Sequence, residues 1–101
     1  MKHHTITLNY GNDGFHPDTD VLPVSTGDTI SFQLGTAPPE SKFKITMDDP
    51  EFFSPSEVED SATKMSVLKA VKTTYRCELF NRVTGKLLSR ADQGGGGVRP
   101  N

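Results

Sequence analysis

The side chains best suited to metal or thiol chemistry are one cysteine, Cys77, and three histidines. A thiolate and imidazole rings are ligands that copper and zinc favour in proteins. We consider His16 as the partner of Cys77, with His3 and His4 as further imidazole ligands. Such a pairing would make the chain a metal-binding or redox protein, and this alternative stays open beside a structural role for Cys77.

The structural role follows from the residues around the cysteine. In the run from Thr73 to Phe80, alternation places Tyr75, Cys77 and Leu79 on one face of a strand. Free cysteine is among the most buried residue types, so we predict an inward-facing row. The predicted structural core contains Tyr75, Cys77, Leu79, Ile30, Phe32 and Ile45.

Catalytic chemistry finds little support in the residue pattern. Arg76 and Glu78 alternate to the face opposite Cys77, so neither can activate the thiol as a nucleophile. The acidic run from Asp48 to Asp60 lacks EF-hand spacing, and the glycines from Gly94 to Gly97 precede no helix that could face a phosphate. Nucleophile-elbow, HExxH, CxxC and Walker sequences are absent. We therefore predict no enzyme, no cofactor and no metal site.

The secondary structure that would position these residues is predicted to consist of short strands separated by turn residues. Between residues 49 and 64 neither regular period fits, and we expect either a long loop or a single helical turn. The best candidate for the turn is Ser54–Glu57, where Pro55 occupies the first helical position. The residues Gly11–Gly14 are typical of a turn. Pro23 has no backbone N–H to donate, which indicates that its strand lies at the edge of a sheet. The expected strands are Thr5–Tyr10, Val21–Val24, Thr29–Leu34, Phe43–Met47, a run within Met65–Val71, Thr73–Phe80 and one near Leu87–Leu88.

About seven short strands predict an all-β, Greek-key β-sandwich. The 101 residues suit one domain, which we place at residues 1–93, followed by a glycine-rich C-terminal segment at residues 94–101. That segment is either a floppy tail or is pressed against neighbouring backbone. The opening residues lack the apolar run of a signal peptide, and no stretch reaches the roughly 20 apolar residues of a membrane span, so we expect a cytoplasmic protein.

Two resemblances agree with this fold. The sequences Phe15-His16-Pro17, Val21–Phe32 and Thr74–Cys77 together resemble the layout of cupredoxin-like sandwiches, and the Tyr-x-Cys pair also resembles immunoglobulin-like sandwiches. The cupredoxin resemblance implies copper held by an early histidine, a cysteine, a late histidine and a methionine. Of these four ligands only the cysteine has a counterpart in this sequence, Cys77. Asp48-Asp49-Pro50-Glu51-Phe52 resembles the bacterial DP-EP family of β-sandwich proteins, although the chain has no Glu-Pro dipeptide.

Function is therefore predicted as binding rather than catalysis. Phe52 and Phe53 are adjacent aromatic residues in an expected loop, where at least one should be exposed and mark an interaction surface. The partner is an unknown protein or a second copy of the chain. Nucleic acid and membranes are not expected as partners, because the net charge is −2 and the basic residues are scattered.

Overall fold

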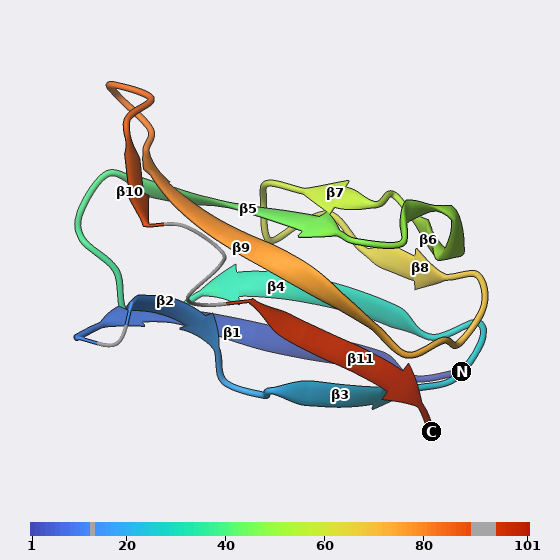
Figure 1. Ribbon diagram of the computed structural model, residues 1–101. Coiled ribbons are helices and arrows are strands. Elements are labelled where there is room, and N and C mark those ends of the chain that lie inside the picture. The colour runs from blue at the N-terminus through green and yellow to red at the C-terminus, as the bar shows by residue number, and fades with distance from the viewer. Residues whose placement is uncertain (13, 90–94) are drawn as a thin grey trace.

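The computed structural model of the 101-residue chain describes residues 1–12, 14–89 and 95–101. Two β-sheets lie face to face in a sandwich (Figure 1). One sheet has the strand order β2 (Gly14–Pro17), β1 (His3–Gly11), β4 (Thr29–Leu34), β8 (Met65–Val67) and β6 (Phe53–Ser54). The other has the order β3 (Val21–Val24), β11 (Gly96–Pro100), β9 (Thr73–Asn81), β5 (Ser41–Met47) and β7 (Glu57–Val58), and β10 (Leu87–Ser89) pairs with β9.

Period-two alternation of apolar and polar residues explains the longest strands. β5 and β9 pair antiparallel from Ser41 opposite Asn81 to Met47 opposite Tyr75, so the apolar residues of both strands share the inner face. β1 and β4 pair in parallel, because the chain crosses to the other sheet through β3 before it returns. The predicted all-β sandwich is thus confirmed. In the described part of the chain no helix is long and apolar enough to span a membrane.

The hydrophobic core fills the space between the two sheets. All six residues predicted for it are buried there, and Tyr75, Cys77 and Leu79 form one inward row on β9. Phe32 of β4 meets Tyr75 across the sandwich in an edge-to-face contact with ring centroids 5.5 Å apart. This contact ties the two sheets together at the level of the C-terminal strand.

The segment between β5 and β8 differs from its prediction. The single helical turn is a 3₁₀ turn, η1, at Pro50–Phe52, four residues before the expected position. Glu57 does not cap a helix but pairs with Thr46 in β7, because strand pairing with β5 outweighs the local capping signal. His16, expected in a loop, lies in β2 and pairs with Asn9.

The C-terminal glycines supply a strand that the sequence pattern left open. β11 lies between β3, to which it is parallel, and β9, to which it is antiparallel. Gly96 faces Tyr75 across this pairing, and a Cβ atom there would lie 2.4 Å from the Tyr75 hydroxyl. Gly94 lies outside the described residues.

Candidate functional site

Cys77 is placed for packing rather than for reaction. Its side chain is fully buried on the inner face of β9, and burial raises the pKa of the thiol to about 12. Since the thiolate is the nucleophile and the metal ligand, the cysteine stays protonated and inert at neutral pH.

The proposed pairing of Cys77 with His16 is wrong. His16 lies between the buried residues Phe15 and Pro17 on β2, so alternation turns its ring to the outer side of the five-stranded sheet. Cys77 faces inward from the other sheet, and the backbone of the five-stranded sheet separates the two side chains. The donor set implied by the cupredoxin resemblance is therefore not assembled. Among the described residues, no group of three or more His, Cys, Asp or Glu side chains could hold a metal ion.

The N-terminal histidines serve the fold instead. His4 Nε2 lies 2.8 Å from Oδ2 of Asp28, a carboxylate that is almost completely buried. The backbone N–H groups of Lys2 and Ser25 also donate to Asp28, both at 2.9 Å. The hydrogen bond from His4, followed by those from Lys2 and Ser25, holds the pKa of Asp28 well below its ordinary value. Sequence reasoning placed Asp28 only in a turn, since nothing local reveals a partner 24 residues away.

Phe52 and Phe53 were expected to expose at least one aromatic ring, but neither residue is fully exposed. Phe53 begins β6 and is only 3% exposed, so it belongs to the hydrophobic core. Its pairing with Val67 of β8 turns the ring inward. Phe52, at the end of η1, is half-buried and packs against the edge of the core.

Sequence reasoning missed Leu68, a large apolar residue that is more exposed than either phenylalanine. Leu68 follows β8 and is 53% exposed, and its backbone N–H donates to the Phe52 carbonyl at 2.9 Å. The Lys69 ammonium lies 6.0 Å from the centroid of the Phe52 ring. We call Phe52, Leu68 and Ala70 the end patch, because they lie on loops at one end of the sandwich.

The loops of the end patch are fixed to the core by backbone hydrogen bonds. Gly27 donates to the carbonyl of Val67 at 2.8 Å, and Val67 donates to that of Asp28 at 2.9 Å. Ala70 donates to the Thr26 hydroxyl at 3.0 Å. The surface is therefore held in one arrangement, which lowers the entropy cost of binding.

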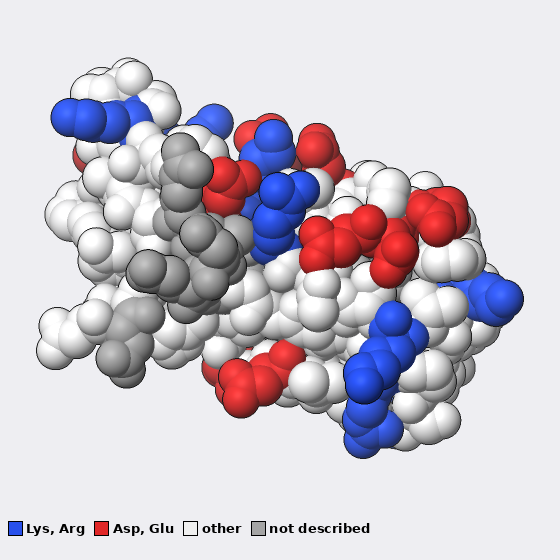
Figure 2. Space-filling model, viewed as in Figure 1, with Lys and Arg blue, Asp and Glu red and all other residues white. Residues whose placement is uncertain are grey.

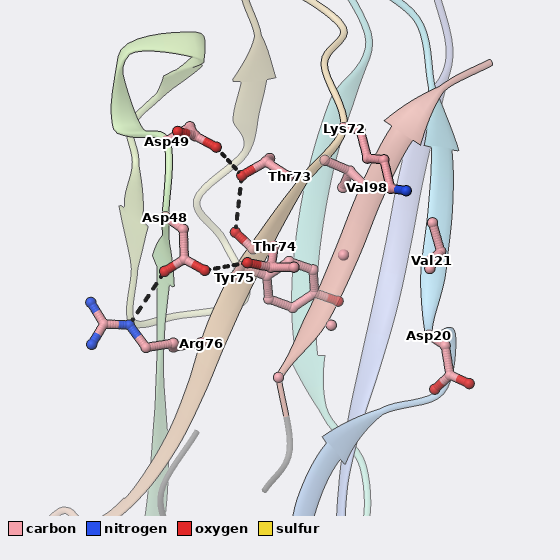
Figure 3. Close-up of a pocket in the computed structure, with 13 residues that line it drawn as sticks. Asp20, Val21, Asp48, Asp49, Lys72, Thr73, Thr74, Tyr75, Arg76 and Val98 are labelled. Carbon is pink, nitrogen blue, oxygen red and sulfur yellow. Dashed lines mark hydrogen bonds and ion pairs between the residues drawn. The ribbon is translucent and has the colours of Figure 1, made fainter. Parts of the chain in front are cut away.

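A hollow of about 780 Å³ adjoins this end of the molecule, on the outer face of the six-stranded sheet. Its floor is the glycine backbone of β11, and Figure 3 shows Asp48, Asp49 and Thr74 on one side of that strand and Asp20 on the other. Gly97 pairs with Thr74 and with Val21, so the missing side chain leaves a trough between two strands that carry side chains.

Short polar contacts order the walls of the hollow. Asp48 accepts from the Thr74 hydroxyl and lies 3.5 Å from Nε of Arg76, while Asp49 accepts from the Thr73 hydroxyl. In Figure 2 acidic side chains lie on both sides of an uncharged area over the middle of the molecule, and basic side chains border that area. The hollow therefore offers hydrogen-bonding groups of both charges beside the end patch.

The free edges of the two sheets are poorly suited to pairing with another strand. β3 and β2 are edge strands that carry Pro23 and Pro17, each without a backbone N–H to donate. The opposite edges, β6 and β7, are two residues long. Pairing of another strand is therefore disfavoured at these four edges.

Comparison with known proteins supports the fold. No protein-family model and no curated protein matches this sequence. The structure is similar to that of a pseudoazurin from Sinorhizobium meliloti, with a TM-score of 0.58 and 14% identity over 100% of this chain and 75% of that one. It is also similar to the cysteine protease inhibitor EhICP2 from Entamoeba histolytica, with a TM-score of 0.59 and 19% identity over 100% of this chain and 97% of that one.

At these identities the similarities establish the fold alone. A pseudoazurin among the similar structures agrees with the cupredoxin-like layout of this sandwich. The resemblance to the DP-EP family, and with it a bacterial source, stays a prediction.

Proposed function

We propose that this protein is a non-catalytic module that binds a protein partner through the end patch. The observation that carries the proposal is Leu68, a large apolar side chain that is 53% exposed beside half-buried Phe52 on anchored loops. Exposed apolar groups on rigid loops lose little conformational entropy on binding and gain the full benefit of burial.

The surroundings of the end patch resemble the usual anatomy of an interface. Stable interfaces have an apolar centre enclosed by a polar rim. Here Lys69 and Lys72 border the patch on one loop, and Asp49 and Glu51 border it on the other. The hollow over β11 begins at Asp49 and Lys72 and extends this rim.

Two further observations support binding over catalysis. The thiol of Cys77 is buried and protonated, and the proline-bearing edges leave the loops as the accessible binding elements. The Entamoeba protein with a similar fold is an inhibitor, a protein that acts by binding, and we take it as a precedent for this architecture. The partner has an apolar side chain that inserts between Phe52 and Leu68, on another protein or on a second copy of this chain.

The test compares two exposed residues at opposite ends of the sandwich. Leu68→Ser removes the apolar group of the end patch, while Val83→Ser changes a 73% exposed residue in the turn before β10 and serves as the matched control. Light scattering after size exclusion reports self-association, and pull-down with the tagged protein reports other partners. We expect Leu68→Ser to weaken the association about tenfold or more, as for a central contact, and Val83→Ser to leave it unchanged.

A protein that stays monomeric at all concentrations and recovers no partner in a Leu68-dependent way would contradict the proposal. So would equal losses in the two variants, since the contact would then not depend on the end patch.

A further inference from the structure

The hollow over β11 has the size and the floor of a small-molecule site. Its volume of about 780 Å³ falls within the roughly 300–1,000 Å³ that is usual for such sites. Gly97 lies at its floor, between Thr74 of β9 and Val21 of β3. A glycine inside a strand often marks a place where a ligand comes close to the backbone.

The two glycines of this floor differ in what the fold requires of them. A Cβ atom at Gly96 would lie 2.4 Å from the Tyr75 hydroxyl, in the core. A Cβ atom at Gly97 would have the Thr73 carbonyl oxygen as its nearest neighbour, at 3.1 Å, and would point to the outer face. A side chain at residue 97 would therefore occupy the hollow rather than the core.

Five charged side chains line the hollow, and one ion pair accounts for two of them. Oδ1 of Asp48 lies 3.5 Å from Nε of Arg76. Within the described part of the chain, Asp20, Asp49 and Lys72 make no ion pair. Two negative groups and one positive group around the recess are thus available to a ligand.

These three groups stand at different places around the trough (Figure 3). Asp49 lies on the β5 side, where the Thr73 hydroxyl donates to its carboxylate and fixes its direction. Lys72 lies over β11, toward the C-terminal end of the strand, and Asp20 lies on the far side, at the start of β3. A ligand that meets all three must carry charges of both signs and extend along the trough.

Two charged groups near the hollow are directed elsewhere. Arg99 follows Gly97 on the outer side of β11, but it does not line the hollow, and its guanidinium donates to the Pro100 carbonyl at 3.2 Å. Asp18 accepts from the backbone N–H of Thr7 at 3.2 Å, in the other sheet. Neither group changes the balance of charge inside the recess.

The trough suits an extended aliphatic chain. β9 and β3 are two strand spacings apart, about 10 Å, with β11 between them. Val21 is 48% exposed and gives the trough an apolar wall. The aliphatic part of a lysine or arginine packs on such a surface while its charged end reaches polar groups.

We propose that the hollow binds a free basic amino acid, such as lysine or arginine. Such a molecule carries two cationic groups and one carboxylate, which complement the two carboxylates and one ammonium that line the hollow without an ion pair. Its α-carboxylate pairs with Lys72 and its α-ammonium with Asp49. Its side chain extends along the trough and places the second cationic group at Asp20. This site does not involve Leu68, so the inference is independent of binding through the end patch.

Titration of the ¹⁵N-labelled protein with amino acids, followed by NMR, tests the inference. We expect L-lysine and L-arginine to cause saturable shifts of the amide signals of Gly97 and Thr74. Norleucine lacks the side-chain cation, and cadaverine lacks the carboxylate. Each should bind about threefold or more weakly than lysine, as expected for the loss of one solvent-accessible ion pair. Nα-acetyl-lysine methylamide, which lacks both α-charges, should bind more weakly than either, and glutamate should cause no saturable shift.

Variants of the protein assign each charge of the ligand to its partner. In Asp20→Asn lysine should lose its advantage over norleucine, and in Lys72→Gln it should lose its advantage over cadaverine. Glu78→Gln is the matched control, because Glu78 lies on the same outer face of β9, opposite Lys44, and does not line the hollow. Glu78→Gln and Leu68→Ser should bind lysine as the native protein does. Thermal unfolding shows that each variant is folded.

Four outcomes would overturn the inference. They are the absence of saturable shifts with lysine and arginine, equal binding of lysine and norleucine, equal binding of lysine and its acetylated methylamide, and binding of glutamate as strong as that of lysine. Equal losses in Asp20→Asn and Glu78→Gln would also contradict it, since binding would then depend on general charge. Each of these results would leave the Leu68-dependent association standing, so the two proposals fail separately.

Discussion

At the scale of single residues, Tyr75 and Cys77 occupy the same inner row of β9 and contribute differently to the fold. Cys77 fills a small volume, and burial keeps its thiol protonated. Tyr75 spans the layer between the sheets, contacts Phe32 and lies beneath Gly96. Among the described residues its hydroxyl has no hydrogen-bond partner, and burial, with smaller contributions from Cys77, Asp18 and Asp20, raises its pKa.

Replacement of these two residues should separate their roles. Tyr75→Ala should lower the free energy of unfolding by about 3 kcal/mol or more, as in other losses of buried aromatic rings. Cys77→Ala should fold with a clearly smaller loss, because only a sulfur atom is removed. Urea unfolding monitored by circular dichroism provides the comparison, and equal tolerance of both changes would contradict the assignment.

A third variant tests the contribution of the Tyr75 hydroxyl alone. Tyr75→Phe removes an unpartnered buried polar group and keeps the ring. Leaving such a group unpaired costs about 1–3 kcal/mol, so we expect Tyr75→Phe to be neutral or stabilising. A large loss of stability would show that the hydroxyl has a partner in the folded protein.

At the scale of the strand, β11 can lie over Tyr75 only because residue 96 has no side chain. A Cβ atom at Gly96 would approach the Tyr75 hydroxyl to 2.4 Å, its Cζ atom to 2.6 Å and Pro17 Cγ to 2.8 Å. A tyrosine packed against Phe32 cannot move aside easily. Glycine is therefore required at this position for a steric reason.

Gly96→Ala should accordingly destabilise the protein by about 1–3 kcal/mol, the usual range for overpacking a core. Gly11→Ala is the matched control, since a Cβ atom at Gly11 would meet nothing within 4 Å. Thermal unfolding of the two variants measures the difference. Similar melting temperatures would mean that β11 shifts to accommodate the methyl group.

The start of β1 depends on the buried carboxylate of Asp28. Three groups donate to it, His4, Lys2 and Ser25, and together they tie the N-terminal strand to the turn before β4. Because folding lowers the pKa of Asp28 below its ordinary value of 3.8, the folded state binds this proton more weakly than the unfolded state. The stabilisation is complete above about pH 5 and is lost as the pH falls through 3.8 and below.

Melting temperatures measured between pH 2 and 6 test this dependence. The native protein should lose stability in acid, while Asp28→Asn should start from a lower melting temperature and show a shallower decline. Glu59→Gln, a change at an exposed acid, should follow the native curve. Parallel curves for the native protein and Asp28→Asn would show that another group carries the acid dependence.

At the scale of the whole molecule, the C-terminal strand joins parts of the sheet that the rest of the chain leaves apart. In the described structure β3 pairs with β11 and reaches β9 only through it. Val98 adds a buried side chain at this junction. The fold therefore closes only when the last residues of the sequence are in place.

Truncation after Gly95 should consequently remove more than a tail. We expect loss of cooperative unfolding and rapid amide exchange in both β3 and β9, because both would lose their common neighbour. Circular dichroism and hydrogen exchange measure the effect. A truncated chain that unfolds cooperatively with native stability would show that residues 96–101 are dispensable for the domain.

The sequence by itself determined the features that follow from alternation along one strand. The inward row on β9, the strand Thr29–Leu34 and the edge strand with Pro23 could all be predicted, because each depends on neighbours two residues away. The all-β class followed from the same signal repeated along the chain.

Only the tertiary structure decided which strands lie side by side. Pairing of β6 with β8 buries Phe53 and leaves Leu68 exposed. His16 and Cys77 lie in different sheets. The glycines of β11 form a strand because β3 and β9 pair with them on either side. Backbone hydrogen bonds and core packing between distant segments set these neighbours, and such contacts leave no periodic trace in the sequence. The end patch and the hollow therefore became visible only in three dimensions.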